Sequence, residues 1–377
     1  MTVLPALNEL SFNLCMQCAR CAGSCPISLK SKLNPRKIML EVAYLSSGIK
    51  TYPPLSLHDK NEVWDCTTCS TCSYRCPREA KPMDVVVALR SFLLENGNVP
   101  RNLVEILEGI FKHGNPWSIS RSRRSEWAKE LNVKYASEVK NAGLLYFVGC
   151  TPSYDLRSQG VAKAIVDNLN KLKIDFSILG NEESCCGNEV YSIGEMGLFE
   201  ELKEYNLTIF DKYHVEQIIT TSPHCYNAFK NRYGTKLQAI HYTQYFAELL
   251  DSGKLKPSKK LRKTVTYHDP CFLGKHNDVY EEPRKLIENI QGVRFIEMSR
   301  SRKRSLCCEG GGGRMWYDIP GRRLSEKRIE EALDMGAEII ATACPFCLLT
   351  LEDSVKTMGN EDKIQVKDVA ELLAEAL

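Results

Sequence analysis

Long apolar stretches, a sizeable net charge and nucleotide-binding fingerprints are all missing from this sequence of 377 residues. No apolar run approaches the roughly 18 residues that a membrane-spanning helix needs. The first residues show no charged segment followed by an apolar one, so we expect no secretory signal. The net charge of +3 is too small to indicate nucleic-acid binding. The glycine run at 310–313 is not followed by Lys and Ser or Thr, and no G-x-G-x-x-G occurs. We therefore expect any flavin or nicotinamide chemistry to belong to another subunit.

Cysteine, by contrast, is abundant, with 17 residues in a chain of otherwise ordinary soluble composition. An odd count, tight spacings and the lack of an export signal argue against a disulfide framework. Thiolates that hold metal must stay reduced. We therefore expect a cytoplasmic protein, or one held at the inner face of the membrane through a partner. The length allows two or three domains.

Eight cysteines form two copies of the spacing C-x2-C-x2-C-x3-C-P, and the second copy lies 51 residues after the first (66 − 15 = 51). In this bacterial ferredoxin spacing, three close cysteines hold one [4Fe–4S] cluster and the fourth reaches the other cluster. We therefore expect one cubane cluster on Cys15, Cys18, Cys21 and Cys76, and a second on Cys66, Cys69, Cys72 and Cys25. Zinc binding by the C-x-x-C pairs is the less favoured alternative. Two adjacent clusters would form a short electron wire.

Helical patterns surround these motifs. Asn34 and Pro35 suit an N-cap and a first helical turn, so a helix is expected from there to about residue 45. Pro82 begins a second helical pattern that ends near Leu94, and a third runs from about 100 to 111. Residues 1–112 are therefore predicted to form an all-α ferredoxin-type domain with cysteine-rich loops.

Residues 113–142 are polar and basic and include Arg121, Arg123 and Arg124. We interpret this segment as a linker. A solvated connection is favoured over a segment that faces a partner.

The other nine cysteines follow a rarer frame: a lone cysteine, an adjacent pair, then a C-x-x-C. The downstream copy is complete and consists of Cys271, Cys307, Cys308, Cys344 and Cys347. The upstream copy lies about 122 residues earlier (307 − 185 = 122) and consists of Cys150, Cys185, Cys186 and Cys225. Ser222 stands where the equivalent of Cys344 would be, so the upstream copy lacks one thiolate.

Strand-like runs lead to each lone cysteine and to each C-x-x-C position, at 144–150, 217–221, 265–271 and 337–343. Helical patterns lie between them, at 161–172, 282–290 and 321–335. This alternation predicts an α/β unit with a mainly parallel sheet, used twice, at 143–255 and 256–377. The predicted fold class is thus an α+β multidomain protein. An all-α ferredoxin-type domain is followed by a duplicated α/β cysteine-rich domain, whose cysteines lie at strand ends.

The second frame resembles the cysteine-rich CCG domain of heterodisulfide reductase. Its fusion to a ferredoxin module resembles the D-type polypeptide of that enzyme, or a fused B and C pair. The same layout occurs in iron–sulfur subunits of glycolate, glycerol-3-phosphate and lactate dehydrogenases, and in quinone reductases fed by electron-transfer flavoprotein. The stretches at 268–271 and 343–347 look close to this last branch.

The resemblance implies a catalytic noncubane [4Fe–4S] cluster, at which a disulfide sulfur binds and is reduced. Its ligands would be Cys271, Cys307, Cys308, Cys344 and Cys347. Five soft thiolates suit iron–sulfur chemistry. A structural zinc or an ordinary cubane cluster is the alternative.

One departure from the family pattern follows the cysteine pair. A glycine normally comes next, as Gly187 does upstream, but downstream the residue is Glu309. We interpret Glu309 as a solvated turn residue, with a proton donor for a leaving thiolate as the alternative. The glycines at 310–313 are expected to let backbone N–H groups approach cluster sulfides.

The other departure is Ser222. With four thiolates, the upstream frame suits a zinc ion, a cubane cluster or an altered noncubane cluster, or it holds nothing; we favour a bound metal. The neighbouring His224 is expected to be a loop residue in preference to a ligand. His268 is expected to pack at a strand end in preference to delivering protons. The basic run at 300–304 is expected to be a solvated face, with binding of an anionic substrate or an acidic partner as alternatives.

Two functions follow from these patterns. In the first, electrons pass from a flavoprotein or another donor subunit through the two cubane clusters to the noncubane site. There a small-molecule or protein thiol/disulfide substrate is reduced or formed. In the second, the chain is an electron-relay subunit between a flavoprotein dehydrogenase or electron-transfer flavoprotein and a membrane quinone-reactive subunit. A redox sensor is a third, less favoured hypothesis, and no nucleic acid is expected as a partner.

Overall fold

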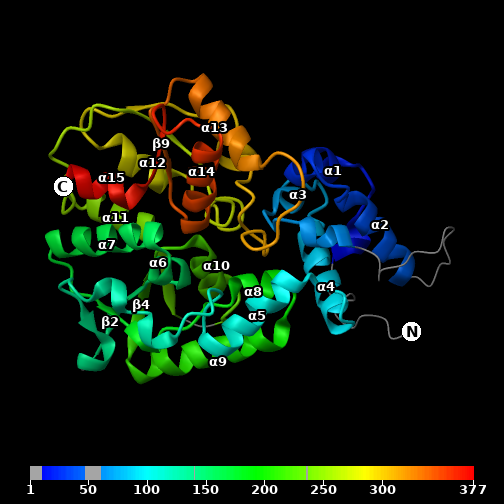
Figure 1. Ribbon diagram of the computed structural model, residues 1–377, viewed down its shortest axis with the longest axis horizontal. Helices are drawn as coiled ribbons and strands as arrows, with labels where there is room; N and C mark the ends of the chain where they lie inside the picture. Colours follow the sequence, from blue (N-terminus) through cyan, green and yellow to red (C-terminus); the bar gives the residue numbers. More distant parts are fainter. Residues whose placement is uncertain (1–10, 47–60, 140, 235–236) are drawn as a thin grey trace.

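The computed structural model describes residues 11–46, 61–139, 141–234 and 237–377 (Figure 1). Its N-terminal part consists of short and medium helices joined by cysteine-bearing loops. The helices are α1 (Arg20–Ser24), α2 (Pro35–Ser46), α3 (Thr71–Tyr74), α4 (Pro82–Glu95) and α5 (Arg101–His113). Helix α2 begins where predicted, since the Asn34 side chain accepts a hydrogen bond from the N–H of Lys37 at 3.2 Å. The expectation of a helical N-terminal module is confirmed.

The rest of the chain alternates strands and helices twice. The first half contains β1 (Lys134–Tyr135), β2 (Gly143–Phe147), α6 (Cys150–Tyr154), α7 (Leu156–Lys171), β3 (Ser177–Ile178), α8 (Asn188–Ile193), α9 (Met196–Lys212), β4 (Val215–Thr220), α10 (Pro223–Asn231), β5 (Gln238–His241) and α11 (Tyr242–Asp251). The second half contains β6 (Thr264–Tyr267), α12 (Glu281–Glu288), β7 (Arg294–Phe295), α13 (Leu324–Asp334), β8 (Ile339–Thr342), α14 (Pro345–Thr357), β9 (Gln365–Asp368) and α15 (Val369–Ala376). No helix within the described ranges has the length and apolar character to cross a membrane.

Each half is built on a parallel sheet of the same order. The first sheet runs β1-β3-β2-β4-β5 and the second β7-β6-β8-β9, and every described pairing is parallel. Apart from the extra edge strand β1, both sheets therefore place their strands in the order 2-1-3-4. The predicted duplicated α/β fold is confirmed. In this order, the chain leaves the first and third strands in opposite directions, which opens a crevice at their carboxyl ends.

The halves pack against each other with approximate two-fold symmetry. Helix α7 lies against α15, and their repeat equivalents α12 and α11 lie against each other (Figure 1). Arg157 on α7 reinforces this contact through Glu371 on α15 at 2.6 Å and Glu352 on α14 at 2.6 Å. The buried Asn168 side chain also donates to the carbonyl of Ala370 at 3.0 Å. The symmetry brings the cysteine-bearing ends of both sheets toward the same region.

The segment at 113–142, predicted to be a solvated linker, is instead packed into the first half. Strand β1 pairs with β3 at the edge of the first sheet, and Trp127 and Ala128 belong to the core. Arg124 is only 1% exposed. The expectation of solvated arginines is therefore wrong for Arg124, because a carboxylate in the fold compensates its charge, as described below. The four domain limits themselves stay a prediction.

The glycine run at 310–313 is a contact between the second half and the helical module. A Cβ atom on Gly311 would lie 2.9 Å from the carbonyl oxygen of Thr67, and one on Gly312 would lie 2.6 Å from that of Cys66. The N–H of Gly313 donates to Glu189 at 2.9 Å. Glycine is therefore required here because two backbones approach closely, and this approach brings the cysteine loops together.

Candidate functional site

The first ferredoxin-type group is assembled from both ends of the helical module. Cys15, Cys18 and Cys21 line one small cavity together with Cys76, which comes from the other motif. Cys18 is exposed, and the neighbouring Met16 side chain is 61% exposed. The cysteines that the spacing predicts to share one cluster therefore lie together, near the molecular surface.

The second group combines Cys66, Cys69 and Cys72 with Cys25. The charges of Cys66 and Cys69 both act on Cys25, and burial is the main cause that raises the pKa of the Cys25 thiol. Burial also raises the pKa of Cys66 to about 11, an effect that the nearby Arg90 guanidinium opposes. This group is deeper than the first, since Cys69 and Cys72 are buried.

The five downstream cysteines form a continuous series of sulfur contacts that begins at the helical module. Cys307 is hydrogen-bonded to Cys69 and also to Cys271. The Sγ atoms of Cys308 and Cys347 are 3.2 Å apart, and Cys347 contacts Cys344. The structure thus brings together all five residues of the complete frame and places one end of the set against the second ferredoxin-type group.

The fold explains this convergence. Cys271 follows β6, the adjacent pair Cys307–Cys308 comes in the loop after β7, and Cys344 follows β8 as the N-cap of α14. Cys271 and Cys344 therefore lie at the carboxyl ends of the first and third strands of the second half. This crevice is where open parallel sheets bind their ligands.

His268 offers these sulfurs a hydrogen bond. Its Nδ1 atom accepts from the Nε–H of Arg328 at 3.2 Å, so Nε2 carries the ring proton. Burial lowers the pKa of His268 to about 3, which keeps the imidazole neutral. The buried Nε2 has no hydrogen-bond partner among the described residues, and a ring nitrogen lies within 4.8 Å of the sulfurs of Cys308 and Cys347. This unpaired N–H fits a cluster sulfur as its acceptor, and a set of five soft thiols fits iron.

His224, expected to be a loop residue, reaches across from the first half and donates to Cys344. Its Nδ1 is 2.8 Å from Glu189, and its ring packs on Phe272 with 4.1 Å between ring centroids. Burial alone would lower the pKa of His224, but Glu189 and Cys344 raise it to about 10. Burial would raise the pKa of Cys344, yet hydrogen bonds with Cys347 and His224 lower it to about 5. The half that lacks a thiolate therefore supplies a cation to the complete site.

Glu309 is not the solvated turn residue that the sequence suggests. It is 6% exposed and pairs with Arg314 at 2.7 Å and with Lys30 at 2.9 Å. Its φ of +76° nearly equals the +77° of Gly187, its repeat equivalent. The chain thus keeps a left-handed turn after both cysteine pairs, and ion pairs offset the strain that a side chain incurs there.

One polar cavity opens onto the downstream site. It has a volume of about 480 Å³, and Cys308 lies in its wall with Asp155 and Arg157 of the other half. Hydrogen bonds with Cys307 and Cys347 lower the pKa of the Cys308 thiol well below its ordinary value, which favours the thiolate. Each cation of the wall has an acidic partner; the pairs include Arg314–Glu309, Arg323–Asp353 and Lys356–Glu352.

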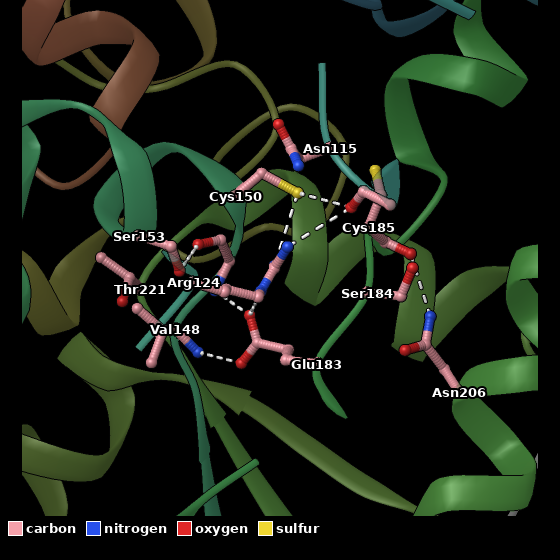
Figure 2. Close-up of polar contacts among 12 residues, drawn as sticks. Asn115, Arg124, Val148, Cys150, Ser153, Glu183, Ser184, Cys185, Asn206 and Thr221 are labelled. Atoms are coloured by element: carbon pink, nitrogen blue, oxygen red, sulfur yellow. Dashed lines mark hydrogen bonds and ion pairs between the residues drawn. The ribbon is translucent and has the colours of Figure 1, made fainter. Parts of the chain in front are cut away.

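The upstream cysteines also converge, around a buried ion pair (Figure 2). Cys150, Cys185, Cys186 and Cys225 are linked in that order by sulfur contacts. Arg124 donates to the Cys150 sulfur at 3.5 Å and to Glu183 at 2.7 Å. The other Glu183 oxygen accepts from the N–H of Val148 at 2.9 Å (Figure 2). Four mutually contacting thiols suit a soft metal.

Ser222 does not take the place of the missing thiolate. Its hydroxyl accepts from the N–H of His224 at 3.3 Å and so caps helix α10. The equivalent residue downstream, Cys344, begins α14 but makes no capping hydrogen bond. The serine thus stabilises the helix that positions His224.

A helical module with two four-cysteine groups, joined to a doubled parallel-sheet unit with a five-cysteine site, defines an iron–sulfur protein of the oxidoreductase class. Comparisons with known proteins agree. A family model described as a cysteine-rich domain (CCG) matches residues 144–230 and 265–352, and one described as a 4Fe-4S dicluster domain matches 11–80.

Three relatives illustrate the similarity. The probable iron-sulfur-binding oxidoreductase FadF of Bacillus subtilis is 34% identical over 98% of this chain and 60% of its own length. The EtfAB:quinone oxidoreductase of Syntrophomonas wolfei is 32% identical over 98% of this chain and 58% of its own. The D-type polypeptide of the dihydromethanophenazine:CoB--CoM heterodisulfide reductase of Methanosarcina barkeri is 32% identical over 99% of this chain and 96% of its own.

The chain therefore belongs to the iron–sulfur oxidoreductase family that contains FadF, the EtfAB:quinone oxidoreductase and the D-type polypeptide of heterodisulfide reductase. It spans about three fifths of the length of the first two relatives and nearly the whole length of the third.

Proposed function

We propose that this protein passes electrons from its two ferredoxin-type groups to the five-cysteine site, where a disulfide-type sulfur substrate is reduced or formed. The observation that carries this proposal is the position of the five cysteines between two neighbours. Cys307 touches Cys69 of the second ferredoxin-type group, whereas Cys308 lines a cavity. Electrons would thus arrive on one side of the site and the substrate on the other.

The cofactor assignment follows the same geometry. Cys15, Cys18, Cys21 and Cys76 would hold one cubane [4Fe–4S] cluster, and Cys25, Cys66, Cys69 and Cys72 the other. Cys271, Cys307, Cys308, Cys344 and Cys347 would hold a noncubane [4Fe–4S] cluster. When bound, that cluster would supply an under-coordinated iron that takes up a substrate sulfur. Residues of the chain contribute the surroundings: His268 and His224 donate to the sulfurs, and the paired side chains around Cys308 form a polar cavity.

At the upstream site we propose a metal on Cys150, Cys185, Cys186 and Cys225. Metal counting on protein purified without oxygen tests this. Three [4Fe–4S] clusters give roughly twelve irons per chain and four give roughly sixteen, whereas zinc upstream gives twelve irons and one zinc. Twelve irons without zinc would contradict an upstream metal.

Sulfur chemistry is tested by electron paramagnetic resonance of the oxidised protein during titration with a neutral, an anionic and a cationic thiol: 2-mercaptoethanol, 2-mercaptoethanesulfonate and cysteamine. A new signal that depends on the thiol is expected, because the substrate sulfur binds where unpaired electrons reside. The three charges also show what the cavity selects. If no thiol produces a signal while a reduced flavoprotein reduces the clusters rapidly, the proposal is wrong and the relay function is favoured.

The relay function has an observation of its own. Acids accompany every cation in the cavity wall, so this wall offers no spare positive charge to an anionic disulfide. Two similar proteins are named as a quinone oxidoreductase and a membrane-anchored ferredoxin. In this second proposal, electrons would pass between a flavoprotein partner and a membrane quinone-reactive subunit, and the protein would lie at the inner face of the membrane.

His224 gives a specific prediction for the five-cysteine site. His224→Asn removes the donor to Cys344, and a charge-assisted hydrogen bond is worth about 1.5–3 kcal/mol. The midpoint potential of this cluster should therefore fall by roughly 60–130 mV in a one-electron titration. Glu189→Gln should shift it in the same direction, because His224 then loses its ionic partner. His214→Asn, an exposed histidine of the same half, is the control and should leave the potential unchanged; an unaltered potential in His224→Asn would contradict the role.

A further inference from the structure

A basic depression lies over the second ferredoxin-type group, where the helical module meets the second half. Its wall contains Cys25 and four cations: Arg75, Arg300, Lys303 and Arg304. No acidic residue is part of its lining in the described structure. Three of these cations come from the basic run that the sequence suggests to be a solvated face, and that run is thus held beside a proposed cluster ligand.

Three of the four cations are unpaired. Arg75, Lys303 and Arg304 are exposed and form no ion pair with any residue of the described ranges, whereas Arg300 pairs with Glu331 at 3.2 Å. Lys303 lies 5.2 Å from the ring centre of Tyr74, which keeps it beside Arg75. This contrasts with the cavity at Cys308, where each cation has an acid. Positive charge in the basic depression is therefore available to a partner.

The same face continues around the first ferredoxin-type group. Arg20 and Arg78 line the cavity that contains Cys18, and again no described acid lines it. Leu29, in the wall of the basic depression, is 59% exposed and adds an apolar contact. Exposed cations around a shallow apolar rim suit the surface of another protein, because a site for a small anion is built from fixed, buried donors.

We propose that the basic depression docks an acidic electron-carrier protein, which delivers electrons to the cluster held by the Cys25 group. This inference rests on the proposed electron transfer through the ferredoxin-type groups. In the step itself the carrier loses one electron and the cluster gains it, and no bond is formed or broken. Oriented positive charge next to Cys25 would steer the carrier so that its redox centre faces the cluster.

The test uses the complete protein with its clusters and follows their reduction by stopped-flow absorbance. Reduced flavodoxin, a small acidic protein, is the carrier probe, and photoreduced deazariboflavin is a neutral reductant that needs no docking. The variant is Arg75→Gln/Lys303→Gln/Arg304→Gln. The matched control is Lys254→Gln/Lys259→Gln/Lys260→Gln, which removes three exposed charges near the C-terminus, at the opposite end of the molecule (Figure 1).

In the depression variant, the second-order rate constant with flavodoxin should fall by about tenfold or more, and its dependence on salt should weaken. The rate with deazariboflavin should not change. An equal loss in the control variant, an unchanged rate in the depression variant, or no reduction of the wild type by flavodoxin would each overturn the docking site. The proposed function itself would fail differently, through deazariboflavin reducing the cubane clusters without any electron reaching the five-cysteine site.

Discussion

Replacing Arg90 by methionine is expected to lower the free energy of unfolding by at least about 4 kcal/mol, which puts it among the most destabilising single changes in a protein of this kind. Arg90 on α4 is fully buried and makes five hydrogen bonds to backbone carbonyls. They join the helical module to both halves of the remaining chain. The partners are Val63, Trp64 and Cys66 of the module, Ser192 of the first half and Gly312 of the second.

Methionine fills a similar volume but has no donor, so the substitution leaves these carbonyls unpaired in the interior. Each unpaired buried group costs about 1–3 kcal/mol, and total stabilities are only about 5–15 kcal/mol. The guanidinium also lies beside Cys66 and would offset the negative charge of a thiolate-bound cluster. We expect Arg90→Met to lose the ferredoxin-type absorbance early in anaerobic guanidinium unfolding.

Arg101→Met is the matched control. Arg101 lies on α5 with 90% of its side chain exposed, and its only ion pair in the described structure is with Glu105, one turn away. Such pairs contribute about 0.3–0.5 kcal/mol, so the control should unfold near the wild-type midpoint. Equal midpoints for the two variants would show that Arg90 does not tie the module to the halves.

The sequence predicts the grouping of the cysteines well because spacing acts locally. Three cysteines two residues apart can only face one point, and a constant offset between repeats implies equivalent strand ends. The helix after Pro35, the parallel sheets and the fold class follow from similarly local signals. The ligand sets derived from these groups remain predictions.

Buried charges were not predictable in this way. Arg90, Arg124 and Glu309 appear in polar stretches, and composition alone suggests solvent exposure. Their burial depends on partners far away in the chain: Glu183 lies 59 positions from Arg124, and Gly312 lies 222 positions from Arg90. Such pairing is set by tertiary packing and has no periodic pattern. His224 was missed for the same reason, since its contact with Cys344 exists only because the two halves face each other.

The second large effect is expected for Cys308→Ser, compared with Cys186→Ser, its equivalent in the other half (308 − 186 = 122). Serine is a hard ligand that suits iron–sulfur clusters poorly. Cys308→Ser should therefore lose about four irons per chain, together with the thiol-dependent paramagnetic signal. Turnover of a disulfide substrate should fall more than about 100-fold, since even outer-shell changes at metal sites cost 10–100-fold.

Cys186→Ser tests whether this loss is specific to the downstream half. Both cysteines are buried, both follow another cysteine, and both precede a left-handed turn. Only Cys308 lines the polar cavity, and only its series of sulfurs continues to Cys69. Cys186→Ser should therefore keep the thiol-dependent signal and lose only the upstream metal, as metal counting would show. If Cys186→Ser abolishes the signal and Cys308→Ser keeps it, sulfur chemistry belongs to the half with four thiolates, and the contact of Cys307 with Cys69 does not mark the electron path.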